Sequence, residues 1–210
     1  MANTSTTRIR QMVQLSILTA IILVLSFTPL GYLRVGTLSI TFIPVPVVIG
    51  AILLGPGAGA FLGTVFGLTS FAQCFGMDPF GTALMSINVF ATLIMCVGSR
   101  ALMGLLSGLI YRLCAKLADG KSETAKKNLE PVMFAVSSAS APLLNTVFFM
   151  SLLYLFFRDA PIVVGTFGST PFFAFVFSAG AINAICELLA SLVIGTAVCM
   201  ALRRAKIFKA

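Results

Sequence analysis

Hydrophobic residues follow one another in long runs along most of this chain, and short groups of charged residues, glycine or proline separate the runs. About 20 apolar residues are needed to span the ~30 Å hydrocarbon core of a bilayer. We therefore predict an all-α integral membrane bundle of about six transmembrane helices, formed by residues 1–210 as a single domain. The predicted helices run from Gln11 to Thr28, Thr41 to Leu54, Gly57 to Phe75, Val89 to Leu117, Leu129 to Phe157 and Phe173 to Arg203.

The second predicted helix is too short to cross ~30 Å by itself. Pro44 and Pro46 lie near its start, where proline is tolerated better than in a helix interior. We expect a non-helical segment at this end to complete the path across the membrane.

Composition agrees with a membrane protein, since the chain is 59% hydrophobic and 10% charged and has a mean hydropathy of +1.06. A soluble core enclosed by a polar surface is incompatible with these values. No small-residue cleavage site follows the first apolar run, so we expect this segment to be retained as a helix.

The net charge of +8 is distributed unevenly along the chain. In a six-span arrangement, one side of the membrane carries only Arg34 and Arg158. The positive-inside rule then predicts that both termini lie in the cytoplasm and that the chain crosses the plasma membrane several times. The pattern favours a topology signal over nucleic-acid binding. The basic residues of the other side are Arg8, Arg10, Arg112, Lys116, Lys121, Lys126, Lys127, Arg203, Arg204, Lys206 and Lys209.

Small residues recur at four-residue spacing on two predicted helices. Gly59, Gly63 and Gly67 form one stripe, which we interpret as a surface for close packing against a neighbouring helix. Ser16 and Ala20 form a shorter pair on the first helix. Their spacing permits tight contact either inside this bundle or with a separate protein.

Polar residues gather on one face of each of the last three predicted helices. At 1.5 Å per residue, Arg100, Asn145 and Glu187 lie roughly 16, 18 and 21 Å from the same membrane surface. Asn88 and Asn183 are expected to line the approach from that surface. The faces comprise Cys96, Arg100, Gly104 and Gly108; Ser138, Pro142 and Asn145; and Gly180, Asn183, Glu187, Ser191 and Gly195.

Arg100 and Glu187 allow two interpretations. A charge at the bilayer centre costs roughly 2.5–3.5 kcal/mol, so it normally faces a partner, a cavity or a ligand. The two residues could form a buried ion pair that fixes the bundle. The nearby asparagines add donors and acceptors that an ion pair does not require, which favours a small-molecule pocket.

Catalysis and resident cofactors have little support in the sequence. The chain has no histidine, no paired intramembrane carboxylates and no Walker A motif. The five cysteines show no CxxC spacing, so we predict no metal site. We expect a protein that is not an enzyme and that holds no cofactor.

Several segments carry a resemblance to a known family. Residues 38–46 (LSITFIPVP) and 50–60 (GAILLGPGAGA) resemble the second and third helices of substrate-binding S components of energy-coupling factor (ECF) vitamin transporters. Residues 99–104 (SRALMG), the Asn145-Thr146 pair and the Asn183-to-Glu187 spacing are similar to the pantothenate, folate and riboflavin branch.

This resemblance implies a six-helix subunit that captures a vitamin from outside and has no ATPase of its own. Import would require a transmembrane coupling subunit and two ATPase subunits, together forming an ABC-type importer. Ser16 and Ala20 would meet the coupling subunit, although serine replaces the family's usual alanine at the first place. The first external loop would act as a lid and would contain Gly31, Tyr32, Gly36 and Thr37.

The residues restrict the substrate only loosely. Arg100 suits a carboxylate, and Glu187 with the asparagines suits hydroxyl or amide groups, a combination that pantothenate offers. Riboflavin would require aromatic stacking, which the 19 phenylalanines could provide, and folate would favour a second cation. A proton-coupled secondary transporter that uses Glu187 and Arg100 is the alternative from another class.

Overall fold

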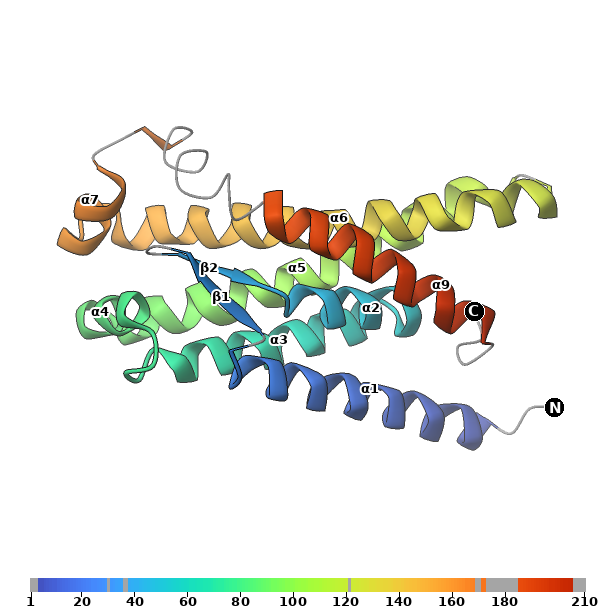
Figure 1. The fold of residues 1–210 in the computed structure, drawn as a ribbon, viewed down its shortest axis with the longest axis horizontal. Helices are drawn as coiled ribbons and strands as arrows, with labels where there is room; N and C mark the ends of the chain where they lie inside the picture. Colours follow the sequence, from blue (N-terminus) through green and yellow to red (C-terminus); the bar gives the residue numbers. More distant parts are fainter. Residues whose placement is uncertain are drawn as a thin grey trace.

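The computed structural model describes residues 4–29, 31–35, 38–120, 122–168, 171–172 and 185–205. Long helices with similar axis directions form the bundle, and two short helices, Pro79–Ile87 and Pro161–Phe167, lie at one end of it (Figure 1). The elements are α1 (Thr4–Ser26), β1 (Tyr32–Val35), β2 (Leu38–Thr41), α2 (Pro44–Leu54), α3 (Pro56–Gln73), α4 (Pro79–Ile87), α5 (Val89–Ala118), α6 (Glu123–Phe157), α7 (Pro161–Phe167), the π-helical turn η1 (Ser191–Gly195) and α9 (Thr196–Arg204).

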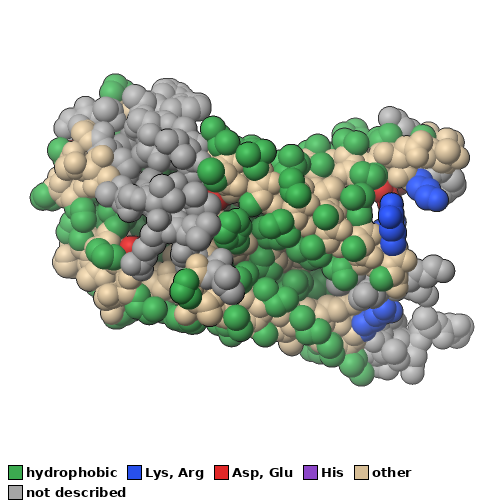
Figure 2. Space-filling view, viewed as in Figure 1, with side chains coloured by type: hydrophobic (Ala, Val, Ile, Leu, Met, Phe, Trp, Pro, Cys, Tyr) green, Lys and Arg blue, Asp and Glu red, His purple; other side chains and the backbone are tan. Residues whose placement is uncertain are grey.

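Four helices are long and apolar enough to cross a membrane, which agrees with the predicted class. Hydrophobic side chains cover the middle of the visible surface, and lysine and arginine gather at one end (Figure 2). We call this end, where α1 begins and α9 stops, the basic end. The four helices are Arg8–Ser26, Val89–Ala118, Thr124–Phe157 and Ile185–Arg204.

The structure corrects several predicted boundaries. Thr41 belongs to β2 and not to a helix, because an antiparallel hairpin precedes α2. The predicted fifth helix starts at Glu123, six residues before Leu129, since the Ser122 hydroxyl caps it by accepting from the Ala125 N–H. α4, α7 and the hairpin were not predicted from the sequence. Residues 173–184 of the last predicted helix lie outside the described residues.

α2 occupies the centre of the bundle. Pro44 occupies its first turn, where the missing N–H costs nothing, and the helix ends at Gly55, whose φ of 102° suits glycine. With 11 residues it is about 16 Å long, too short to span the membrane. The hairpin extends from its N-terminal end toward the end that holds α4 and α7 (Figure 1). A non-helical segment thus precedes α2, as predicted.

The glycine stripe of α3 packs directly on the backbone of α5, which confirms the predicted packing role. A Cβ on Gly59 or Gly63 would lie closer than 3.0 Å to the carbonyl oxygen of Gly104 or Arg100, respectively. Gly67 meets the Cα of Val97 in the same way, at 2.6 Å from an ideal Cβ. The segment of α5 that carries Arg100 therefore lies against α3 with no side chain between the two backbones.

A proline inside α6 is accommodated by a hydroxyl from the last helix. Pro142 has no N–H to donate to the carbonyl of Ser138, four residues earlier. The Ser191 hydroxyl donates to that carbonyl at 2.7 Å instead. In a bilayer such a freed backbone group needs a protein partner, and a serine on a neighbouring helix supplies it. Ser191 opens the π-helical turn, so this irregular turn faces the proline of α6.

We expect Gly63→Ala to destabilise the bundle by about 1–3 kcal/mol, because the new methyl group would meet the Arg100 carbonyl. Gly57→Ala is the matched control, since a Cβ there has nothing within 4 Å. Thermal unfolding in detergent, followed by circular dichroism, measures the difference. Equal melting temperatures for the two variants would contradict the close α3–α5 contact.

Candidate functional site

Arg100 is buried in the bundle and is held by neutral groups. One terminal nitrogen donates to the Cys96 carbonyl at 3.1 Å and to the Ser99 hydroxyl at 3.3 Å. The guanidinium carbon lies 4.7 Å from the ring centroid of Phe66 and 5.3 Å from that of Phe149. Cation–π attraction of this kind is strongest where water is excluded. Helices α3, α5 and α6 together position the charge.

Arg100 does not form a direct ion pair with Glu187. No nitrogen of Arg100 lies within 4.0 Å of a carboxylate oxygen among the described residues. The Nε of Arg100 is buried and has no hydrogen-bond partner in the described part of the chain. A guanidinium has five N–H donors, so this one keeps unused hydrogen-bonding capacity.

Asn145 lies on the α6 face that meets Arg100. It precedes Phe149 by four residues, so the two side chains share one face of the helix. Asn145 is 8% exposed, and its Oδ1 lacks a hydrogen-bond partner within the described ranges. An unsatisfied buried acceptor costs about 1–3 kcal/mol, which a bound donor would recover.

Glu187 accepts a hydrogen bond from the backbone of the hairpin. Its Oε1 lies 2.8 Å from the backbone nitrogen of Thr41, and Glu187 is only 6% exposed. The Thr41 hydroxyl is buried beside this bond. The structure thus brings the last helix and the hairpin together at Glu187.

The other predicted site residues are more dispersed. Asn88 is exposed and caps α5, since its side chain accepts from the Ala91 N–H at 3.0 Å. Asn183, Gly36 and Thr37 lie outside the described residues. Gly31 is buried before β1, which begins at Tyr32. Ser16 and Ala20 are exposed on α1.

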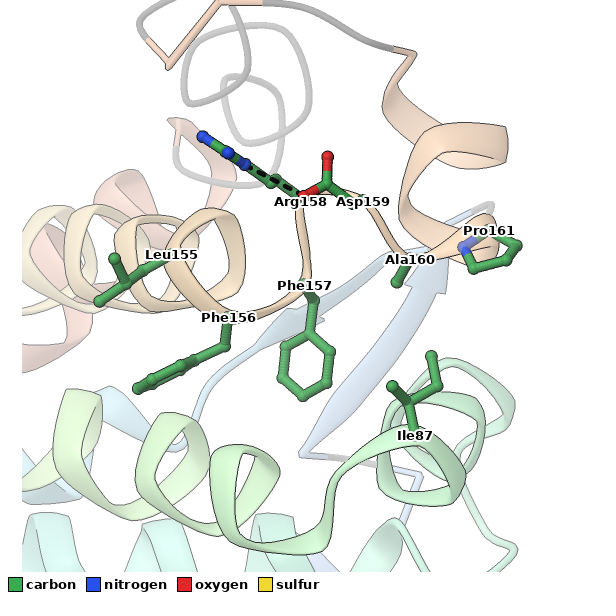
Figure 3. A pocket seen from close by; sticks show the side chains of 8 residues that line it. All are labelled: Ile87, Leu155, Phe156, Phe157, Arg158, Asp159, Ala160 and Pro161. Carbon is green, nitrogen blue, oxygen red and sulfur yellow. Dashed lines mark hydrogen bonds and ion pairs between the residues drawn. The ribbon is translucent and has the colours of Figure 1, made fainter.

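A surface groove of about 630 Å³ lies away from these residues (Figure 3). It is formed by Ile87 and by residues 155–161, where α6 turns into α7. Arg158 and Asp159 pair with each other there at 3.2 Å and are exposed. Its lining includes neither Arg100, Asn145 nor Glu187, so it does not belong to the candidate site.

Comparison with known proteins identifies one family for this chain. Residues 10–199 match the model of the ECF transporter substrate-specific component family. The chain belongs to this family. A search of curated proteins found no match. Substrate-specific components are substrate-binding subunits of ECF transporters and not enzymes.

Within this substrate-specific component, Arg100 has aromatic neighbours that were not predicted from the sequence. Phe66 lies between two glycines of the packing stripe and is fully buried. Its position on that face was a readable signal, because the stripe was predicted to meet another helix. Among the described residues, no group of three or more His, Cys, Asp or Glu side chains could hold a metal ion.

We expect Arg100→Met to melt at the same temperature as the wild-type substrate-specific component without added solute, or at a higher one. The substitution removes a buried charge that has no carboxylate partner, while methionine keeps much of the apolar stem. Thermal unfolding in detergent measures the shift. A large loss of stability would instead mean that the charge holds the bundle together.

Proposed function

We propose that this subunit captures a small anionic vitamin or vitamin precursor, and that the solute is pantothenate. The observation that carries the proposal is a buried Arg100 held by a carbonyl, a hydroxyl and two ring faces instead of a carboxylate. A carboxylate on the solute would provide the counter-charge and accept from the unused donors. The free Oδ1 of Asn145 would accept from a hydroxyl or amide N–H of the solute.

We further propose that the chain crosses the plasma membrane six times with both termini in the cytoplasm. α2 with the hairpin, and α3, would then add two crossings to the four long apolar helices. The basic end would be the cytoplasmic end under the positive-inside rule. Solute would enter from the opposite side, where the hairpin would serve as the lid.

Energy for import would come from a separate coupling subunit and two ATPases. Ser16 and Ala20 are proposed to contact the coupling subunit. Both residues are exposed, and the Ser16 hydroxyl is satisfied within its own helix by the Met12 carbonyl at 2.9 Å. The Ser16 hydroxyl can therefore lie against a partner helix while keeping this local hydrogen bond.

Purified protein is expected to bind pantothenate, and Arg100→Ala is expected to weaken binding at least about ten-fold through loss of a charge-assisted hydrogen bond. Isothermal titration calorimetry measures both affinities, and mass spectrometry identifies any solute that co-purifies. Arg112→Ala, at the exposed end of α5, is the control. Recovery of a flavin or folate would refute the pantothenate assignment, and proton-driven transport by the purified chain alone would refute the dependence on ATPases.

Ser16→Leu is expected to reduce recovery of the coupling subunit when the tagged protein is purified from its native membrane, because the larger side chain prevents close helix approach. Ser151→Leu is the matched control, since Ser151 makes the same local bond, to the Val147 carbonyl at 2.6 Å. Quantitative mass spectrometry of the eluates compares the variants. Equal recovery would exclude Ser16 from the interface.

A further inference from the structure

The pairing of the hairpin leaves the backbone N–H of Thr41 on the open edge of β2. Thr41 stands opposite Tyr32 in the antiparallel register, and the Phe42 N–H donates to the Gly31 carbonyl at 3.1 Å. Positions that exchange hydrogen bonds alternate along an antiparallel pair. The Phe42 position faces β1, so the neighbouring Thr41 N–H points away from β1.

Glu187 satisfies this edge donor from the last helix. Its Oε1 lies 2.8 Å from the Thr41 nitrogen, and both residues are at most 9% exposed. A backbone N–H that water cannot reach needs a protein acceptor, and a carboxylate is a stronger acceptor than a neutral carbonyl. The bond joins segments 146 residues apart in the sequence.

The bond lies at the end of the hairpin that joins α2. Thr41 ends β2, and only Phe42 and Ile43 separate it from Pro44 at the start of α2. Ile43 is fully buried, so α2 anchors this end of the hairpin through packing. The bond to Glu187 ties the same end sideways to the last helix.

We propose that Glu187 is a positioning residue that holds the β1–β2 hairpin against the last helix through the Thr41 N–H. In this role Oε1 of the carboxylate serves the hairpin backbone and not the Arg100 guanidinium. The inference concerns the solute-free protein, so it does not depend on which solute binds at Arg100.

Hydrogen–deuterium exchange of the solute-free protein in detergent tests this role. Without the acceptor, in Glu187→Leu, amides of residues 38–43 should exchange about ten-fold faster or more, as expected for loss of a hydrogen bond to a charged group. Glu187→Gln keeps the shape and a weaker acceptor, so its exchange should lie between wild type and Glu187→Leu. It also serves as the test if the leucine variant does not fold.

Two controls separate positioning from general stability. Amides of α3 and α5 should exchange at wild-type rates in both variants, because these helices pack through their own backbones. Glu130→Gln makes the same change at the basic end, where Glu130 pairs with Arg203, and should leave residues 38–43 unchanged. Wild-type exchange at residues 38–43 in Glu187→Leu would overturn the proposal. Faster exchange throughout the bundle, or a glutamine variant as fast as the leucine variant, would overturn it as well.

Discussion

The close contact between α3 and α5 is the constraint on which the site depends. Glycines on both helices let the two backbones approach, and the contact includes the carbonyl of Arg100 itself. The same contact places Phe66 of α3 beside the guanidinium, so that the Phe66 ring centroid lies 4.7 Å from the guanidinium carbon. A larger residue in the stripe would separate the helices and remove the ring from the charge. The packing of the two helices and the placement of Arg100 therefore have one cause.

The remaining helices are joined by polar groups whose partners must come from the protein. Pro142 leaves the Ser138 carbonyl without its usual helical donor, and the Ser191 hydroxyl donates to that carbonyl instead. The Ser137 hydroxyl similarly donates to the Ser107 carbonyl of α5 at 2.8 Å. Because lipid cannot satisfy such groups, each bond also fixes how neighbouring helices are rotated. These bonds place the faces of α5, α6 and the last helix toward one another.

Hydrophobic runs were sufficient to predict the long helices, because the length and polarity of a bilayer restrict what can span it. They placed the start of α5 at Val89 and the end of α6 at Phe157, as the structure has them. The hairpin was missed because two four-residue strands carry almost no periodic signal and, among the described residues, pair with each other alone. Thr41 was consequently assigned to a helix, and its bond with Glu187 could not be foreseen.

The polar faces were readable from spacing, but the partners of each side chain were not. Asn88 illustrates the limit, because the residue interpreted as lining the approach to a pocket also caps α5, a role that was not predicted. An asparagine directly before an apolar helix is a common N-cap, so the local signal was present and competed with the pocket interpretation. For Arg100 and Glu187, depth on the helices indicated proximity but not which groups they bond.

The separate partners of the two charges explain how a membrane interior can keep both without pairing them. An Arg100–Glu187 ion pair would neutralise each charge but would commit the guanidinium's donors to the protein. In the structure, ring faces, a carbonyl and a hydroxyl stabilise Arg100 while its Nε has no partner among the described residues. Glu187 instead accepts a hydrogen bond from the backbone of the hairpin. This division leaves the Nε donor of Arg100 without a protein partner among the described residues, as the proposed capture of an anionic solute requires.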